Sequence, residues 1–89
     1  MADLIKGITE TGFKFTLFED VLDDMELLEL LVGVDKDPSM IPSLIEKLIG
    51  PKQKKRLYDH VRDSKGKVSV TRVTKELESI FTKAGQLKN

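Results

Sequence analysis

Residues 41–61, IPSLIEKLIGPKQKKRLYDHV, decide the helical character of this 89-residue chain. The first half places apolar side chains along one helical face, at Ile41, Leu44, Ile45, Leu48 and Ile49. Gly50 and Pro51 then favour the end of one helix and the start of another. The second half carries four basic residues around a narrow apolar strip: Lys52, Lys54, Lys55 and Arg56. The stretch therefore predicts two short helices, at about 38–49 and 51–62, the second with a basic surface.

A short strand region is predicted at the N-terminus. Residues 13–18, FKFTLF, alternate apolar and polar side chains with the two-residue period of a strand that buries one face. Gly7 and Gly12 favour bends, so this segment and the residues before it could form a loose hairpin. A strand needs a partner, so this one is expected to pair locally, with residues 68–70, or with another chain.

The acidic segment at about 21–33 is predicted to form the first helix, capped by Asp20 or Asp23 and ended by Gly33. Its apolar residues fall into two stripes on nearly opposite sides. One stripe is Val21, Met25, Leu28 and Val32, and the other is Leu27, Leu30, Leu31 and Val34. A helix at the surface of a monomer needs only one stripe. Two stripes indicate a central helix, or a helix with one face on the core and the other on a partner.

The last predicted helix spans residues 68–85, with Ser69 or Thr71 as its cap and Gly85 as its end. A single apolar stripe follows its length: Val70, Val73, Leu77, Ile80, Phe81 and Ala84.

Together these segments predict one mainly α domain, with four short helices in a small bundle and a short N-terminal β-strand or hairpin. Residues 1–18 form the strand region, 19–85 the helical body and 86–89 a loose tail. A chain of this length is expected to have a free energy of unfolding on the order of 4–13 kcal/mol.

The composition disfavours several classes of protein. The chain has no cysteine, which excludes disulfides, thiolate metal sites and a cysteine nucleophile. No apolar run is long enough to span a membrane, and the N-terminus lacks the pattern of a signal peptide. His60, the only histidine, has no nucleophile at a recognisable spacing. We therefore expect no enzyme activity, no catalytic, cofactor-binding or metal site, and a location in the cytoplasm.

The zero net charge conceals a division along the chain. Residues 1–50 carry eleven acidic and four basic side chains, whereas residues 51–89 carry four acidic and eleven basic ones. Either the two halves complement each other, across the core or between copies, or each half faces a different partner. The balanced total favours the first alternative, and it predicts a weak homo-oligomer whose subunits are aligned by charge.

The basic residues at 52–56 raise nucleic acid as an alternative partner, because clustered lysine and arginine bind phosphates. Tyr58 adds an aromatic ring of the kind that stacks on bases. Against this role, Asp59 and Asp63 lie on the same segment, and the whole chain is neutral where nucleic-acid-binding domains are usually basic. Nucleic-acid binding or regulation is therefore the alternative to protein binding.

Four segments, taken in order, resemble the tail assembly chaperones of long-tailed (siphovirus-type) bacteriophages. They are FTLFEDVLDDMELLELL, PSMIPSLIEKLIGPKQKKRLYDHVRD, SKGKVSV and VTRVTKELESIFTKAGQLKN. In the second segment the residues that match the family's pattern are Gly50, Gln53, Leu57 and Tyr58. The resemblance covers about residues 13–89. The family's common ending of Lys-Asn followed by serines is present only as Lys88 and Asn89.

The resemblance implies a mostly helical, non-enzymatic protein that binds the tape measure protein and keeps it soluble until tail tube subunits polymerise around it. Such proteins act in the cytoplasm of the bacterial host and are usually absent from the finished virion. Many are made in two lengths through a ribosomal frameshift, and the extension of the longer form is thought to engage the tail tube protein. Another phage tail or connector protein is a further alternative.

The predicted partner-binding residues lie on the second stripe of the first helix: Leu27, Leu30, Leu31 and Val34. Phe13 and Phe15 belong to the predicted strand, whose exposed edge offers a second surface to which another chain could add a strand. Aspartate at Leu27 and Leu31 is predicted to leave the chain folded and to abolish partner binding. If the chain unfolds instead, the leucines belong to the core and the partner surface lies elsewhere.

Overall fold

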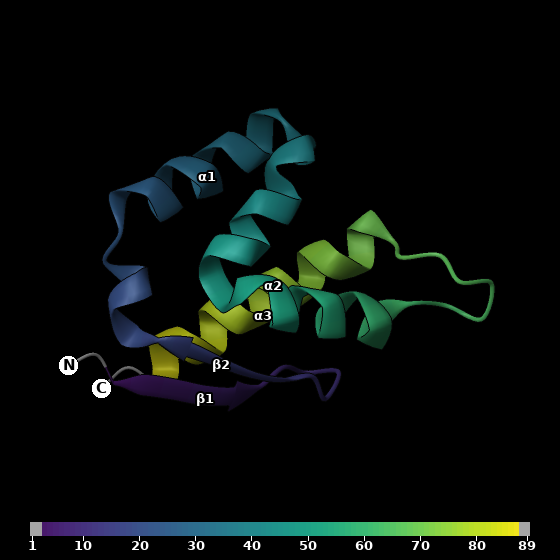
Figure 1. The fold of residues 1–89 in the computed structure, drawn as a ribbon, viewed down its shortest axis with the longest axis horizontal. Coiled ribbons are helices and arrows are strands. Elements are labelled where there is room, and N and C mark those ends of the chain that lie inside the picture. Colours follow the sequence, from purple (N-terminus) through teal and green to yellow (C-terminus); the bar gives the residue numbers. More distant parts are fainter. Residues whose placement is uncertain (1–2, 88–89) are drawn as a thin grey trace.

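The computed structural model describes residues 3–87, without the side chain of Leu87, and shows a mainly helical chain with an N-terminal hairpin (Figure 1). The elements in chain order are β1 (Leu4–Ile8), β2 (Lys14–Phe18), a 3-10 turn (Glu19–Leu22), α1 (Met25–Lys36), a second 3-10 turn (Pro38–Met40), α2 (Ile41–Val61) and α3 (Val70–Leu87). The prediction of a mainly α fold with a short hairpin is confirmed, and the number of helices is not.

β1 and β2 pair antiparallel, with Leu4 opposite Phe18 and Ile8 opposite Lys14. The predicted strand thus pairs locally, which was one of the three alternatives. Gly12 closes the turn with φ +94°, a value that residues with a Cβ rarely adopt. One face of the hairpin is buried through four side chains, those of Ile5, Phe13, Phe15 and Leu17.

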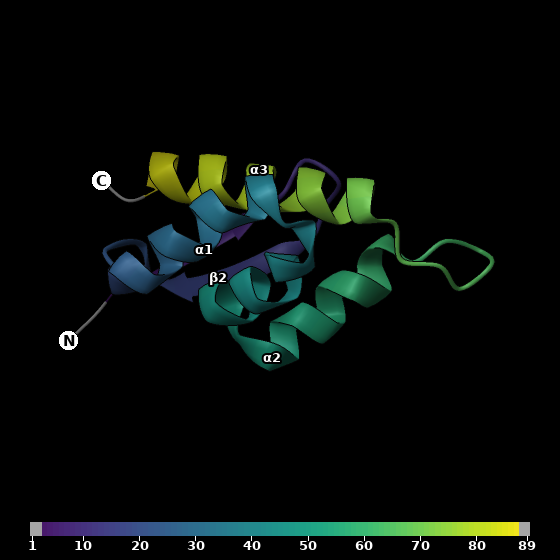
Figure 2. The same cartoon turned by 90° about the horizontal axis from the view of Figure 1, so that it is seen from above.

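The inner face of the hairpin is covered by two helices (Figures 1 and 2). α3 packs on β1, and α2 packs on β2. α1 packs on α2 and on the Pro38–Met40 turn, at the opposite end of the molecule from the hairpin in Figure 1. The largest fully buried side chains come from β2, α2 and α3: Phe15, Leu44, Ile45, Leu57 and Ile80.

The predicted second and third helices form one element, α2, which is kinked at Gly50. This glycine has φ +85° and ψ 165°, outside the helical region, and Pro51 follows it within α2. The prediction of four helices is therefore corrected to three. The Gly-Pro pair changes the direction of the chain without a connecting loop, so both halves of α2 bury apolar side chains in the same core.

α1 begins and ends later than predicted. Asp24 is its cap, and its carboxylate accepts the backbone N–H two residues on at 2.8 Å, whereas Asp20 and Asp23 lie in and just after the preceding 3-10 turn. Gly33 lies inside the helix instead of ending it. A Cβ on Gly33 would lie 2.7 Å from Cε of Met40, so the missing side chain lets the turn after α1 pack closely against the helix.

α3 is capped by Ser69, one of the two predicted caps, whose Oγ accepts the backbone N–H of Arg72 at 3.3 Å. The helix passes through Gly85 and ends at Leu87, so Gln86 of the predicted loose tail is helical. The rest of that predicted tail, residues 88–89, lies outside the described residues.

Candidate protein-binding surface

α1 presents a row of apolar side chains to solvent. Met25 is 69% exposed, Leu28 48%, Leu31 40% and Val32 55%, and we call these four residues the α1 surface. The steps from Met25 to Leu28 and from Leu28 to Val32 are three and four residues, which is the spacing of the contact seam in a coiled coil. Large apolar side chains gathered on one helix face typically mark a site of protein contact.

The structure places the predicted partner-binding residues differently from the sequence interpretation. Leu27 is buried in the core at 4% exposure, and Leu30 and Val34 are half-buried against that core. Of the predicted stripe, only Leu31 belongs to the α1 surface. The stripe expected to face a partner therefore faces α2, because α1 needs one apolar face to pack on the rest of the molecule.

Phe13 and Phe15 are also unavailable to a partner, since they are 3% and 1% exposed. The outward edge of β2 is closed as well. The side-chain amide of Gln53 accepts the N–H of Thr16 at 2.8 Å and donates to the carbonyl of Thr16 at 2.6 Å. The predicted strand addition at this edge is therefore corrected: α2 side chains occupy the backbone groups that an incoming strand would need.

Lys47 of α2 forms ion pairs with acidic side chains at the start of α1. Its Nζ lies 3.2 Å from Oε1 of Glu26 and 3.3 Å from Oδ2 of Asp24. These contacts raise the pKa of Lys47 above its ordinary value, and the contact with Glu26 has the larger effect. The backbone N–H of Glu26 is the main cause that lowers the pKa of Asp24. The ion pairs favour the observed rotation of α1, in which Leu27 faces the core and Leu28 faces solvent.

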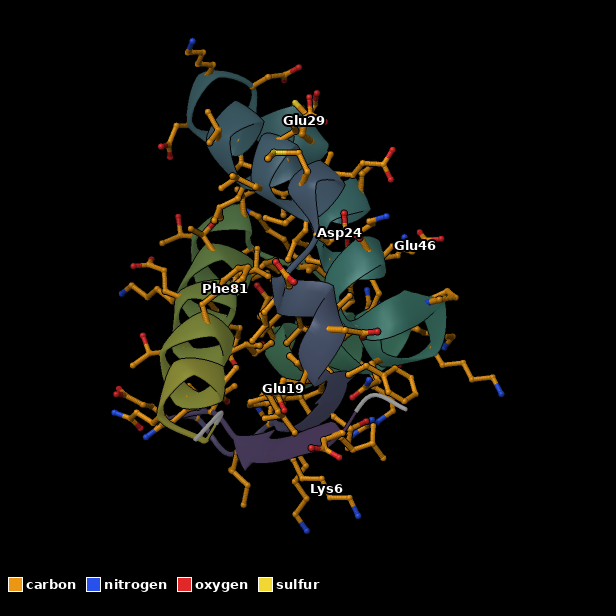
Figure 3. The ribbon with its side chains drawn as sticks, turned by 90° about the vertical axis from the view of Figure 1, so that its left-hand side faces the viewer. Lys6, Glu19, Asp24, Glu29, Glu46 and Phe81 are labelled. Carbon is orange, nitrogen blue, oxygen red and sulfur yellow. The ribbon has the colours of Figure 1, made fainter. Side chains whose placement is uncertain are left out.

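Acidic side chains lie beside the α1 surface. Glu29 and Asp35 are exposed, and Figure 3 shows Glu29 projecting from α1 away from the body of the molecule. Charged side chains next to an apolar seam select the partner's charge and orientation in coiled coils. A helix with basic residues beside its own apolar seam would complement this surface.

Three of the four residues of the predicted basic surface have partners within the chain. Nζ of Lys54 pairs with Glu46 at 2.7 Å, which raises the pKa of Lys54, and Lys55 lies 3.6 Å from Asp59. Arg56 donates to the carbonyl of Lys14 at 2.9 Å, and its guanidinium lies 5.3 Å from the ring centroid of Phe13. Lys52 is exposed. The two ion pairs lie within α2, and the contacts of Arg56 attach α2 to the hairpin.

Tyr58 is half-buried and lines an apolar groove of about 420 Å³ between the start of α2 and the start of α3. Other residues of the groove include Ile41, Pro42, Val68 and Val70. The tyrosine ring is therefore partly buried against the core, and the rest of its surface faces an apolar groove and not a basic one.

A cluster of polar side chains that sequence reasoning missed attaches the hairpin turn to the helices. Glu76 of α3 is 3% exposed, and its carboxylate accepts the hydroxyl of Thr9 at 2.8 Å and that of Thr11 at 2.6 Å. The Thr11 hydroxyl also lies 2.9 Å from Nε2 of His60, which is exposed. The sequence feature that could have indicated the burial of Glu76 is its position on the apolar stripe of α3, three residues after Val73 and one before Leu77.

Stability is expected to fall at low pH through the aspartates that accept backbone N–H groups. Asp63 accepts those of Lys67 and Lys65 at 2.9 and 2.8 Å, and the first of these bonds is the main cause that lowers its pKa. Because the folded-state pKa lies below the unfolded value, this stabilisation is complete above the ordinary aspartate pKa of 3.8 and is lost as the pH falls through the folded pKa.

We therefore expect Asp63→Asn to reduce the dependence of the thermal unfolding midpoint on pH between about pH 5 and about pH 2. Asp35→Asn is the matched control, because Asp35 makes no side-chain hydrogen bond within residues 3–87. If the two variants lose stability with acid as steeply as the unsubstituted chain, the turn at 63–67 does not contribute in this way.

Within residues 3–87, no helix is both long and apolar enough to cross a membrane. The same residues contain no group of three or more histidine or acidic side chains placed to hold a metal ion. The sequence matches no family model, and comparisons with curated proteins and with solved structures give no match.

Proposed function

We propose that this chain is a non-enzymatic tail assembly chaperone of a long-tailed bacteriophage, which binds the tape measure protein and keeps it soluble in the host cytoplasm while the tail tube assembles. The single observation that carries the proposal is the α1 surface, formed by Met25, Leu28, Leu31 and Val32. The resemblance of residues 13–89 to that family supplies the identity of the partner.

The chemistry of the α1 surface suits a helical partner. An exposed apolar row with coiled-coil spacing packs best against the apolar face of another helix, whose side chains insert between its own. The tape measure protein is a long helical molecule prone to aggregation, so it needs its apolar faces covered. Glu29 and Asp35 beside the row keep the chaperone itself well solvated and favour a partner with basic flanks.

The alternative role in nucleic-acid binding has weaker support. Lys54 and Lys55 are ion-paired, Arg56 is bound to a backbone carbonyl, and Tyr58 is half-buried beside an apolar groove. A phosphate would have to compete with the contacts of the three basic side chains. A structural role elsewhere in the tail, or engagement of the tail tube protein, would draw on the same α1 surface and remains the second candidate.

The test is co-expression with the long coiled-coil product of the neighbouring gene. We expect the unsubstituted chain to keep that product in the soluble fraction and to co-purify with it. The double variant Leu28→Asp/Val32→Asp, which places two carboxylates in the contact seam, should reduce the recovered complex by at least about tenfold. Circular dichroism should show that the variant remains folded, because both side chains are exposed.

Val70→Asp is the matched control, since Val70 is an exposed valine at the start of α3 and is not part of the α1 surface. It should leave the complex intact. Loss of the complex with Val70→Asp but not with the α1 double variant would assign the partner to the apolar groove instead. Failure of the unsubstituted chain to solubilise the product would overturn the proposed function.

A further inference from the structure

The outward edges of β1 and β2 differ in their contacts with the rest of the chain. The backbone N–H of Thr9 donates to the carbonyl of Phe13 at 2.9 Å, and that of Glu19 donates to the carbonyl of Asp3 at 2.8 Å. The backbone N–H and carbonyl groups of the odd-numbered residues of β1 therefore point toward β2. Even-numbered residues therefore direct their backbone N–H and carbonyl groups away from the partner strand. On β2 these groups belong to Lys14, Thr16 and Phe18, and on β1 to Leu4, Lys6 and Ile8.

The outward edge of β2 is occupied by α2. Gln53 binds both backbone groups of Thr16, and the guanidinium of Arg56 donates to the carbonyl of Lys14. Within residues 3–87, no side chain or loop forms a hydrogen bond with the outward backbone groups of Leu4, Lys6 and Ile8. Just beyond β1, the N–H of Glu10 donates to Oγ of Ser79 of α3 at 3.1 Å. Figure 1 shows β1 as the lowest element with no helix below it, so the outer face of the hairpin is uncovered. One edge is thus closed and the other is open to a further strand.

We propose that the open edge of β1 binds an extended segment of another protein as an added antiparallel strand, and that this segment carries an acidic residue between two apolar ones. The site lies at the opposite end of the molecule from the α1 surface in Figure 1 and does not depend on the proposed function. Main-chain hydrogen bonds to Leu4, Lys6 and Ile8 would supply the affinity, and their side chains the selectivity.

The side chains of β1 define the chemistry of the added strand. Leu4 and Ile8 are 52% and 53% exposed on the outer face, and Lys6 lies between them. Figure 3 shows the Lys6 side chain extending away from the body of the molecule, and it forms no ion pair with residues 3–87. An acidic residue opposite Lys6 and apolar residues opposite Leu4 and Ile8 would continue each row across the sheet.

The same lysine argues against a second copy of this chain as the occupant. A two-fold antiparallel arrangement that used all three outward positions would pair Leu4 with Ile8 of the other copy and place the two Lys6 side chains directly opposite each other. Like charges in that position destabilise the pairing. Lys6 therefore discourages self-association while it attracts an acidic strand.

The test uses the isotope-labelled full chain and a capped seven-residue peptide that has valine, glutamate and valine on one face and threonine on the other. Amide resonances of Leu4, Lys6 and Ile8 should shift and their hydrogen exchange should slow on addition of the peptide. A peptide with lysine in place of the central glutamate should bind about tenfold more weakly. Lys6→Glu should reverse that preference, whereas Lys65→Glu in the loop before α3 should not change it.

Equal binding of the two peptides, or a preference that Lys6→Glu leaves unchanged, would overturn the charge selection. No protection of the β1 amides by either peptide would overturn the site. Protection that depends on the concentration of the chain alone would assign the edge to a second copy. None of these results depends on the tape measure protein, so the outcome is separate from the test of the α1 surface.

Discussion

Leu27→Asp is expected to unfold the domain. Leu27 is 4% exposed and belongs to the buried core beneath α1, so the substitution places a carboxylate among apolar side chains. Burial of an unpaired charge costs about 4 kcal/mol or more. The whole domain has only about 4–13 kcal/mol of stability at this length. Urea denaturation followed by circular dichroism should show a chain that is mostly unfolded in the absence of denaturant.

Leu28→Asp is the matched control for this prediction, because it makes the same change one position along the same helix. Leu28 is 48% exposed, so the carboxylate remains in water and the free energy of unfolding should change by less than about 1 kcal/mol. The burial of Leu27 corrects the expectation from the sequence that aspartate at this position leaves the chain folded, and the two variants test that correction. If Leu28→Asp unfolds the chain and Leu27→Asp does not, α1 is rotated relative to the arrangement described above.

Phe15→Ala is expected to have the second large effect. Phe15 lies on the inner face of β2 at 1% exposure, where α2 and α3 meet the hairpin. Removal of a buried phenylalanine ring costs about 3–5 kcal/mol, through lost burial and the cavity left behind. Denaturant titration should therefore show a midpoint far below that of the unsubstituted chain.

Phe18→Ala supplies the comparison on the opposite face of the same strand. Phe18 is 56% exposed and lies across from Leu4, so its loss should cost less than about 1 kcal/mol. Equal destabilisation by the two variants would mean that the hairpin does not bury its inner face against the helices. Comparison of Phe15→Ala with Phe18→Ala therefore tests whether buried and exposed side chains alternate along β2, and it requires no binding partner.

Local patterns in the sequence were sufficient where a residue's neighbours along the chain decide its conformation. The alternation in residues 13–18 predicted a strand, and Gly12 predicted the bend before it. The apolar stripe of α3 and the cap at Ser69 followed from helical spacing. Gly50 was recognised as a break, although the structure shows a kink within one helix. Helix ends at Gly33 and Gly85 were wrong because glycine is tolerated inside a helix that packing stabilises.

The tertiary structure alone decided which surfaces are available. Both stripes predicted for the first helix are apolar in sequence, and only the packing of α1 on α2 selects Leu27 for the core and leaves Leu28 in solvent. Both edges of the hairpin have the same backbone groups, and only the approach of Gln53 from α2 closes one of them. Periodicity fixes which residues share a face, because it follows from backbone geometry. It cannot fix what that face meets, because the neighbour comes from a distant part of the chain.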